Sequence, residues 1–511
     1  MESPQISSKK KSQDFFRRIF SRSNDFSKKV NFKTHLLEIL LLALLAVGFF
    51  LRVYKLGEQS YWIDEGFTYM QMEAIHEHGY PLLNSGIVDV KDIILPYFLQ
   101  LPRFFGTSPF WLRLIPALFG TASIGVIFLL AKNLWNSKVG LFSAFLFTFS
   151  YWQIAWSRQL RPYALLVFFI LMALLFLIIY EKKLEKKYLI AVLIFVVCAI
   201  ASKSAGILLL VPLIGYLFLK KLYRLGLISI ALLGLGIYIF RDMLISALGM
   251  GMVNYGKYYL NGYFWQFFGI FFFLTILGFL LAIIYEKNNW RVHVVIGIFF
   301  IAATLFFSFF VLVNQYRYLF FVTPFLFMYS SYALNFLFPT TKKYLFICIV
   351  LLTFDFFTVH SLLFTPQVIF ALEEYTPQPN FKQAYQEIKT EIKDEDAIIS
   401  AYPYMDKIYL GRSTFAIPIS YTGRVQDSTG QLGKEHYSGT PMLYTQHSPL
   451  DKYIASPLRK QQNAYILVDS MSKSRMSQAM REYIQKFGKV VFQDNADLAQ
   501  AIWVYRISLK N

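Results

Sequence analysis

The sequence predicts a polytopic α-helical membrane protein that carries a soluble α/β domain near its C-terminal end. Of the 511 residues, 56% are hydrophobic and 16% are charged, whereas an ordinary soluble domain is about 45–50% apolar and about 25% charged. The apolar residues fall in runs of about 15–25 separated by short basic patches, which is typical of proteins with several membrane-spanning helices. This composition excludes a soluble enzyme, a disordered protein and a fibrous repeat.

Eleven apolar runs are expected to cross the membrane as helices. A helix needs about 20 apolar residues to span the hydrocarbon core, and in lipid its backbone amides must be bonded within the helix. The runs cover residues 36–54, 110–131, 139–156, 163–180, 188–201, 206–219, 225–240, 264–284, 292–313, 318–337 and 344–363. Two of these runs, the fifth and the sixth, are short for a span.

The distribution of lysine and arginine predicts the orientation. The basic N-terminal tail and the basic connections lie on one side of the membrane if residues 91–106 do not cross it, and the positive-inside rule makes that side cytoplasmic. We therefore expect residues 91–106 to lie on the outer surface as an amphipathic segment. The protein is then a multi-pass protein of the cell (inner) membrane with a cytoplasmic N-terminus and an extracytoplasmic C-terminal domain. These loops also explain the net charge of +19, so nucleic acid is not an expected partner.

The chain is thus expected to have three parts. They are a basic cytoplasmic tail over residues 1–34, a membrane domain over 35–364 with a long outer loop at about 55–109, and a soluble domain over 365–511. Alternating strand and helix patterns predict an α/β layer in the soluble part. Helices are expected over 381–393, with Asn380 as a cap, and over 474–487; strands are expected over 397–401, 464–468, 489–493 and 500–507. The polar stretch Gly423–Gly439 is expected to be a mobile loop.

The outer connections hold charged residues where the composition of a membrane protein disfavours them. A charge at the end of a span is costly to desolvate unless it has a partner. Several outer segments place a charge at this depth, and together they indicate a site for an anionic substrate at the outer leaflet. The residues are Asp64, Glu65, Asp92, Arg113, Arg158, Arg161, Lys203, Arg241 and Arg317.

Two adjacent carboxylates, Asp64 and Glu65, follow an aromatic residue in the loop after the first run. A carboxylate in this place can accept a proton from an attacking hydroxyl; alternatively, the pair is a solvated turn or a helix N-terminal charge. Arg158 and Arg161 join the third and fourth runs and can stabilise a phosphate leaving group. Lipid headgroup contact, or pairing with the two acids, is the alternative for them.

Other charged residues leave two interpretations open. Lys203 and Arg317, the latter followed by Tyr318, can bind a phosphate or extend their charged ends to the membrane interface. Arg113 can pair with an acid or contact substrate. His76-Glu77-His78 has poor spacing for a metal, because residues two apart on a helix point in different directions, so a surface helix is expected there.

Taken together, these motifs resemble the GT-C glycosyltransferases, specifically the bacterial relatives of protein O-mannosyltransferases and aminoarabinose lipid A transferases. The resemblance is strongest over the first four runs. It rests on Trp62-x-Asp64-Glu65, on Arg113-Leu114-x-Pro116 with Gly120, on Ser157-Arg158-x-x-Arg161-Pro162-Tyr163, and more weakly on Lys203 and Arg317-Tyr318. The C-terminal segments Asp396-Ala397-Ile398-Ile399 and Tyr409-Leu410-Gly411-Arg412 are also similar to this group.

The resemblance implies a GT-C fold and a hexosyl- or pentosyltransferase. Its sugar, carried on a polyprenyl monophosphate, would be transferred to an acceptor hydroxyl or phosphate at the outer face of the membrane, with inversion at the anomeric carbon. It implies Asp64 as general base, with Glu65 orienting the acceptor or substituting for Asp64. Arg158, Arg161, Tyr163, Lys203, Arg317 and Tyr318 would bind the donor phosphate. Many relatives carry His-Pro-Pro or Lys-Pro before the surface helix where this chain has Lys91-Asp92-Ile93-Ile94-Leu95-Pro96, so Asp92, like Arg113, is either structural or a substrate contact.

No cofactor is expected to be required, although a divalent metal is compatible with the family. The expected partners are the polyprenyl-phosphate sugar donor, the membrane, and an acceptor that is a glycan, a lipid or a protein. The sequence holds no P-loop or GxGxxG nucleotide fingerprint. The main alternative is a lipid or glycolipid transporter or flippase without transferase activity, which would favour repeated halves and ionisable residues near mid-bilayer. A non-catalytic scaffold whose outer domain binds a partner is the second alternative.

Overall fold

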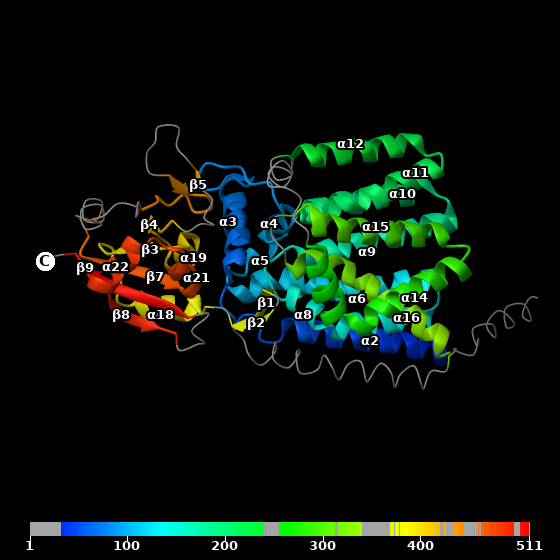
Figure 1. Ribbon diagram of the computed structural model, residues 1–511, viewed down its shortest axis with the longest axis horizontal. Coiled ribbons are helices and arrows are strands. Elements are labelled where there is room, and N and C mark those ends of the chain that lie inside the picture. Colours follow the sequence, from blue (N-terminus) through cyan, green and yellow to red (C-terminus); the bar gives the residue numbers. More distant parts are fainter. Residues whose placement is uncertain are drawn as a thin grey trace, which may run out of the picture.

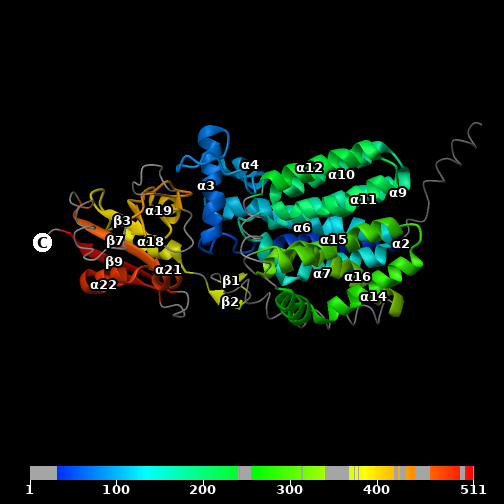
Figure 2. The same ribbon diagram turned by 45° about the horizontal axis from the view of Figure 1, so that its top comes forward.

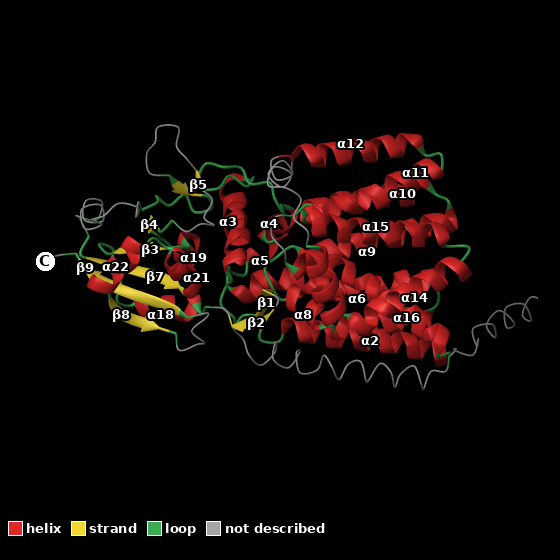
Figure 3. Ribbon diagram, in the orientation of Figure 1, coloured by secondary structure: helices red, strands yellow, loops and turns green. Residues whose placement is uncertain are grey.

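The computed structural model shows a helical body and a sheet-containing C-terminal domain, with helix α3 (Ile63–His78) between them (Figures 1 and 2). The structure describes residues 32–239, 241, 255–311, 315–339, 368–372, 374–377, 379–418, 424–425, 433–443, 458, 461–494 and 501–509. Figure 3 shows that strands are confined to the C-terminal part and to short segments beside the helical body.

Each of the first ten predicted runs is mostly helical where the structure describes it. The elements are α2 (Phe32–Val53), α6 (Pro109–Leu134), α7 (Ser137–Phe149), α8 (Tyr151–Ser157), α9 (Tyr163–Lys183), α10 (Lys186–Ser202), the 3₁₀ helix η2 (Ser204–Leu209), α11 (Leu210–Leu219), α12 (Tyr223–Ile239), the π-helix η3 (Tyr258–Phe267), α14 (Gly269–Tyr285), α15 (Trp290–Phe309), the 3₁₀ helix η4 (Tyr316–Val322) and α16 (Thr323–Leu337). The eleventh run, 344–363, lies outside the described residues.

The predicted number of eleven spans is not confirmed. Within the described residues, five helices are long and apolar enough to cross a membrane, or up to seven if each bent pair is one span. The run at 139–156 is two helices, α7 and α8, that meet at an angle of 61° around Ser150. The run at 206–219 combines η2 and α11 and is among the shorter apolar helices. Hydropathy reports how apolar a run is and carries no signal for a bend.

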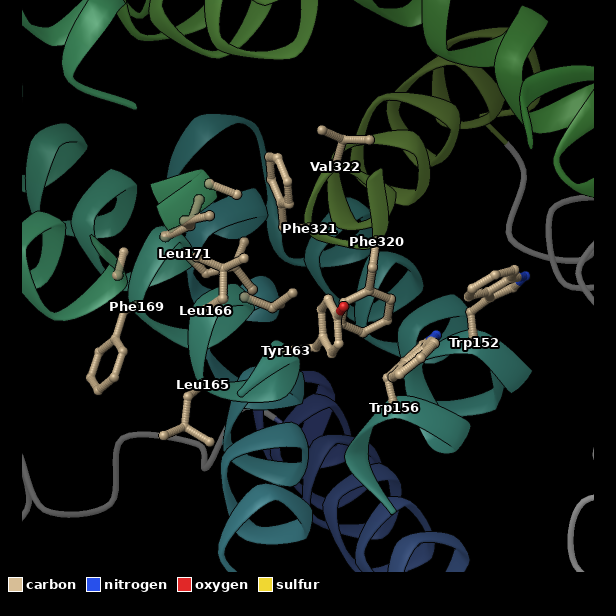
Figure 4. Close-up of a cluster of buried hydrophobic side chains, with 14 of the residues drawn as sticks. Trp152, Trp156, Tyr163, Leu165, Leu166, Phe169, Leu171, Phe320, Phe321 and Val322 are labelled. Atoms are coloured by element: carbon tan, nitrogen blue, oxygen red, sulfur yellow. The ribbon is translucent and has the colours of Figure 1, made fainter. Parts of the chain in front are cut away.

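The core of the helical body lies around α9 and α16. In the most apolar window of α9, 78% of the residues are buried, whereas the corresponding value for α2 is 17%, so α2 is peripheral. Figure 4 shows part of this core, where Trp156 of α8, Tyr163 of α9 and Phe320 of η4 pack together. The ring centroids of Trp156 and Tyr163 are 4.6 Å apart.

In the segment between α2 and α6, helix α3 lies beside the helical body (Figure 1). After α3 the segment forms two short helices, α4 (Ile94–Phe98) and α5 (Gln100–Arg103). Leu95 and Leu99 are buried, whereas Leu101 and Phe104 are 63% and 88% exposed. One side of the segment is therefore buried and the other is exposed, and its place on the outer membrane surface stays a prediction.

The C-terminal domain is built on a mixed five-stranded sheet in the order β4-β3-β7-β9-β8. Its central strands, β3 and β7, are parallel, and β9 is antiparallel to both β7 and β8. The elements are β1 (Val368–Leu372), β2 (Glu374–Pro377), α18 (Phe381–Lys389), β3 (Ala397–Ser400), α19 (Pro403–Leu410), β4 (Phe415–Ala416), β5 (Arg424–Val425), β6 (Lys434–Glu435), β7 (Asn463–Asp469), α21 (Ser470–Arg475), α22 (Gln478–Phe487), β8 (Lys489–Gln493) and β9 (Ile502–Ser508).

The predicted elements of this domain are found with two changes. Asn380 caps α18 by accepting a hydrogen bond from the Gln383 amide, as expected, but the helix ends at Lys389. The helix predicted over 474–487 is two helices, because Ser477 caps a new helix by accepting a hydrogen bond from the Met480 amide. Part of the stretch predicted to be a mobile loop is described, and it contains β5 and β6, which pair with each other.

Candidate active site

The two predicted acids lie in the first turn of α3. Trp62 is the N-cap residue, and its backbone amide donates a hydrogen bond to the carboxylate of Glu65 at 2.9 Å. Carboxylates in the first turn are favoured because the helix dipole is positive there. Successive residues on a helix point about 100° apart, so Asp64 and Glu65 face different neighbours.

Glu65 faces the helical body and forms a closed ion pair with Arg113 of α6. Both side chains are at most 1% exposed, and Arg113 Nη2 lies 2.6 Å from Glu65 Oε2. The remaining N–H groups of Arg113 donate to Glu65 Oε1 and to the carbonyls of Leu56, Gln59 and Ser60. Every donor of this guanidinium is therefore used, and the Arg113 prediction resolves to pairing with an acid.

Glu65 also fixes the loop that carries the predicted phosphate ligands. The amide of Leu160 donates a hydrogen bond to Glu65 Oε1 at 2.6 Å. With Trp62 and Arg113 as its other donors, the carboxylate has no free acceptor position facing a substrate. Close packing of α6 against α8 supports the same loop, because a Cβ at Gly120 would meet Ser157 Oγ at 2.1 Å.

Asp64 faces the other way, toward two arginines from distant parts of the chain. Its Oδ2 lies 3.3 Å from Nη1 of Arg317 and 3.7 Å from Nη2 of Arg161. Arg161 Nη1 also donates to the Asp64 carbonyl at 2.8 Å. The Asp64 side chain is 21% exposed, in contrast to the enclosed Glu65. The structure thus brings together Asp64, Arg161 and Arg317.

These arginines have hydrogen-bonding capacity to spare. Nε of Arg161 and Nε of Arg317 are enclosed and have no hydrogen-bond partner among the described residues, whereas Nη1 of Arg317 lies in the ion pair with Asp64. Aromatic rings hold the Arg317 guanidinium, which lies 5.0 Å from the ring centroid of Trp62 and 5.7 Å from that of Tyr318. Enclosed N–H groups of a cation are strong donors for an anion such as phosphate.

A second ion pair lies beside this cluster. Lys203 Nζ is 3.1 Å from Asp92 Oδ2, and it also lies 5.0 Å from the ring centroid of Tyr163. Asp92 has a φ of +54°, in the left-handed region that few non-glycine residues adopt. In this structure Asp92 pairs with Lys203, which is one of the residues predicted to bind the donor phosphate.

Arg158 is separate from the cluster. Its Nη1 donates to the carbonyl of Tyr54 at 2.6 Å and to the carbonyls of Leu51 and Arg52, at the end of α2. The prediction grouped Arg158 with Arg161, but a turn between α8 and α9 sends the two side chains in different directions. Arg158 satisfies the free carbonyls that every helix leaves at its C-terminus.

The His76-Glu77-His78 motif lies at the exposed end of α3, as expected for a surface helix. His78 Nε2 is 3.7 Å from Glu77 Oε2. Within the described part of the chain, no group of three or more His, Cys, Asp or Glu side chains is placed to hold a metal ion.

The C-terminal domain adds residues that the sequence did not indicate. Tyr409 of α19 accepts a hydrogen bond from the Tyr61 amide at 2.9 Å. A Cβ at Gly66 would lie 2.6 Å from the Tyr404 ring, so α3 and α19 are in direct contact at that point. The ring of Phe67 stacks on that of Tyr437 at 4.1 Å. Since these partners lie more than 300 residues from α3 along the chain, local sequence patterns could not have found them.

Comparison with known proteins first defines the class. A family model for dolichyl-phosphate-mannose-protein mannosyltransferase matches residues 93–245. Solved structures with similarity over about nine-tenths of the chain belong to membrane glycosyltransferases with the GT-C fold. The solved structures show that the chain shares their fold over most of its length, and the family model matches part of it, in agreement with the GT-C resemblance inferred from the sequence.

Individual structures make the comparison specific. ArnT from Cupriavidus metallidurans in the apo state is 13% identical with a TM-score of 0.60, covering 92% of this chain and 98% of that chain. The same protein bound to undecaprenyl phosphate is 16% identical with a TM-score of 0.59, covering 93% and 98%. The Archaeoglobus fulgidus oligosaccharyltransferase AglB, in complex with an inhibitory peptide and a dolichol-phosphate, is 13% identical with a TM-score of 0.56, covering 91% and 74%. No curated protein sequence matches the chain.

Proposed function

We propose that this membrane protein transfers a sugar from a polyprenyl-phosphate-linked donor to an acceptor hydroxyl at the outer face of the membrane, with inversion at the anomeric carbon. The observation that carries the proposal is the position of Asp64. It is the partly exposed acid of the α3 pair, and it lies between two arginines with enclosed, unpartnered N–H groups. A base beside a set of anion donors is what displacement of a phosphate requires.

In the proposed reaction, the carboxylate of Asp64 accepts the proton of the acceptor hydroxyl. The acceptor oxygen then forms a bond to the anomeric carbon, and the bond between that carbon and the phosphate oxygen breaks. The electron pair leaves with the polyprenyl phosphate. Arg161, Arg317 and Lys203 neutralise the charge that develops on the leaving group. The Tyr318 ring contacts Arg317, and the Tyr163 ring contacts Lys203.

The other predicted residues have supporting roles in this proposal. Glu65 is a positioning residue, because its carboxylate is enclosed and saturated by Arg113, Trp62 and Leu160. Arg158 holds the end of α2. Asp92 holds Lys203 until the phosphate takes its place. We propose that side-chain cations supply the charge neutralisation without an obligatory metal, so turnover should survive EDTA.

The names of the relatives support the donor class. ArnT was solved with undecaprenyl phosphate and AglB with a dolichol-phosphate, and both lipids are polyprenyl phosphates. The charged cluster at helix ends favours a transferase over a flippase, which would place ionisable groups nearer mid-bilayer. We propose the predicted topology as well, with the N-terminus cytoplasmic and the C-terminal domain extracytoplasmic.

The test uses the full-length protein in lipid nanodiscs with labelled hexoses and pentoses linked to undecaprenyl phosphate, together with a cell-envelope extract that supplies acceptor hydroxyls. Release of undecaprenyl phosphate is measured for the unchanged protein, for Asp64→Asn and for Glu58→Gln, whose carboxylate forms an exposed ion pair with Lys55. We expect at least one donor to be consumed, and Asp64→Asn to lose about 10³-fold or more in rate while binding undecaprenyl phosphate normally. Consumption of no donor, or full activity in Asp64→Asn, contradicts the proposal.

A further inference from the structure

Arg52, near the C-terminal end of α2, is a buried cation without a counter-charge. It is 0% exposed, and its Nη1 donates to the carbonyl of Gly48 in the same helix at 3.0 Å. Nε and Nη2 are enclosed and have no hydrogen-bond partner among the described residues. None of the ion pairs between described side chains includes Arg52. Since a charged side chain is almost never fully buried unless it is paired, Arg52 requires a partner.

A second arginine at this end of α2 carries the same charge and cannot be that partner. Arg158 is 8% exposed, and its Nη1 lies 3.3 Å from the carbonyl oxygen of Arg52. Backbone carbonyls accept the hydrogen bonds of Arg158, but they supply no full negative charge. An unpaired ion in a protein interior is strongly unfavourable, and a like charge nearby makes it more so. The missing partner of Arg52 is therefore expected to be an anion.

Glycines on two helices leave the space that encloses the Arg52 guanidinium. A Cβ added at Gly48 would lie 3.4 Å from Nη1, and a Cβ added at Gly120 of α6 would lie 3.1 Å from Nε. The same Cβ at Gly120 would lie 2.1 Å from Oγ of Ser157 on α8. The ring centroid of Phe147 on α7 is 5.9 Å from Cζ of Arg52. Side chains and backbone of α2, α6, α7 and α8 thus surround the guanidinium.

Gln153 adds a second unpartnered donor on the same face of α8. It lies one turn before Ser157, so the two residues share a face of the helix, and Ser157 Oγ donates to the Gln153 carbonyl. Gln153 is 1% exposed, and its Nε2 has no hydrogen-bond partner within the described part of the chain. Because Ser157 meets Arg52 at Gly120, this face of α8 is the one that packs on α2 and α6.

We propose that Arg52 and Gln153 form a buried binding site for a small inorganic anion, of which chloride is the most abundant. An anion supplies both the counter-charge and an acceptor for the unpartnered nitrogens, whereas buried water supplies only the acceptor. Surface that faces lipid counts as exposed, so a 0% exposed guanidinium does not reach a lipid headgroup. The enclosure by four helices favours a single-atom ion over phosphate.

This inference does not depend on the proposed function, because the site uses none of the residues proposed to bind the donor. Its place in the fold nevertheless gives it a structural consequence. The bound ion would join α2 to α8, which lie next to each other in the helical body (Figure 1). The turn that carries Arg161 follows α8 directly, so the ion would stabilise the helix that positions this turn.

The test measures the stability of the full-length protein in nanodiscs as a function of chloride. Sodium gluconate replaces sodium chloride at constant ionic strength, so that only the kind of anion changes. An ion that binds the folded state alone stabilises it by mass action. We expect the unfolding temperature, followed by circular dichroism, to rise by about 2 °C for each tenfold increase in chloride above half-saturation. Bromide should act as chloride does.

Arg52→Met removes the buried charge and keeps most of the side-chain length. This variant should lose the chloride dependence, and in gluconate it should be at least as stable as the unchanged protein, because an apolar side chain in place of a buried charge is often neutral or stabilising. Arg291→Met is the matched control, since the Arg291 side chain is 40% exposed and lies beside the acid Glu181; it should keep the chloride dependence. If Arg52→Met does not fold, Gln153→Met should raise the half-saturating chloride concentration about tenfold.

Three outcomes would overturn the anion site. Equal unfolding temperatures in chloride and gluconate would mean that buried water alone solvates Arg52. A chloride dependence that persists in Arg52→Met, or in Gln153→Met with an unchanged half-saturating concentration, would place the ion elsewhere. Loss of the dependence in Arg317→Lys would assign the chloride to the donor phosphate site instead. None of these measurements involves turnover, so their result is distinguishable from that of the undecaprenyl phosphate release assay.

Discussion

Two adjacent residues on α3 show two opposite uses of a carboxylate beside arginine. We call Glu65 with Arg113 the Glu65 clamp, and Asp64 with Arg161 and Arg317 the Asp64 pocket. In the clamp, Glu65 and Arg113 are both buried, and every polar atom of the pair has a partner. In the pocket, Asp64 is partly exposed, and the facing guanidinium groups keep N–H groups without partners. The first arrangement is complete in itself, and the second is completed only by a ligand.

The difference separates structural from chemical roles without any knowledge of the substrate. A buried ion pair whose partners are all present contributes rigidity, and removing one partner is strongly destabilising. Enclosed donors without partners lower the stability of the folded protein. Their presence therefore indicates a site that binds an anionic ligand. The clamp then explains how the pocket keeps its shape: Glu65 binds the amide of Leu160, next to Arg161.

The largest expected effect comes from breaking the clamp. Glu65→Gln leaves the Arg113 charge buried without a counter-charge, so we expect the free energy of unfolding to fall by about 3–5 kcal/mol. Thermal unfolding in detergent, followed by tryptophan fluorescence, measures this loss. Asp64→Asn should change the unfolding temperature little. Equal destabilisation by the two substitutions would contradict the division of roles.

Next in size is the removal of an anion donor from the pocket. Arg317→Lys keeps the charge but loses the unpartnered Nε–H group of the guanidinium. We expect a rate loss equivalent to about 2.7–4 kcal/mol, or roughly 10²–10³-fold, measured as undecaprenyl phosphate release. Arg158→Lys is the matched control, since Arg158 donates to backbone carbonyls at the end of α2. A comparable loss in both variants would show that the two arginines share one site.

Much of the helical body could be predicted from the sequence, because long apolar runs have a strong signal. The strands β3, β7, β8 and β9 were also found by periodicity. The bend at Ser150 and the break before Ser477 were missed. Each depends on one or two residues whose effect is decided by packing partners elsewhere in the chain.

The sequence predicted which residues belong to the candidate site better than it predicted what each residue does there. The sequence placed Asp64, Arg161 and Arg317 in one cluster, and the structure brings them together. It could not separate Asp64 from Glu65, or Arg161 from Arg158, because the direction of a side chain depends on helix phase and turn geometry. The contributions of Tyr404 and Tyr437 depend on how the C-terminal domain docks on α3, which no local pattern encodes.

Asp406 sharpens the comparison, because it is as buried as Glu65 but has hydroxyl partners instead of a cation. Burial raises the pKa of Asp406 to about 6, although hydrogen bonds from Ser413, Tyr385 and Ser400 lower it. Between about pH 4 and pH 6 the unfolded chain therefore loses this proton before the folded protein does. Stability should fall over that interval and level off above it, by at most ~3 kcal/mol.

Asp406→Asn should remove this part of the pH dependence. Unfolding temperatures of the full-length protein at pH 4 and pH 7 are compared between the unchanged protein and the variant. The contribution of other titrating groups cancels in that difference. If the variant shows the same decline as the unchanged protein, Asp406 is not the group that titrates.

The smallest expected effect concerns Gly66, which follows Asp64 and Glu65 on α3 and contacts a different part of the molecule from either of them. Asp64 faces the arginines, Glu65 faces Arg113, and Gly66 faces the C-terminal domain, where an added Cβ would lie 2.6 Å from Tyr404. Gly66→Ala should therefore force α3 and α19 apart, with a loss of about 1–3 kcal/mol in stability. Gly125→Ala is the matched control, because a Cβ there would meet its nearest neighbour only at 4.0 Å. If the domain is part of the site, Gly66→Ala should slow undecaprenyl phosphate release and leave undecaprenyl phosphate affinity unchanged. Loss of lipid phosphate binding instead would mean that the domain supports the arginine side of the pocket.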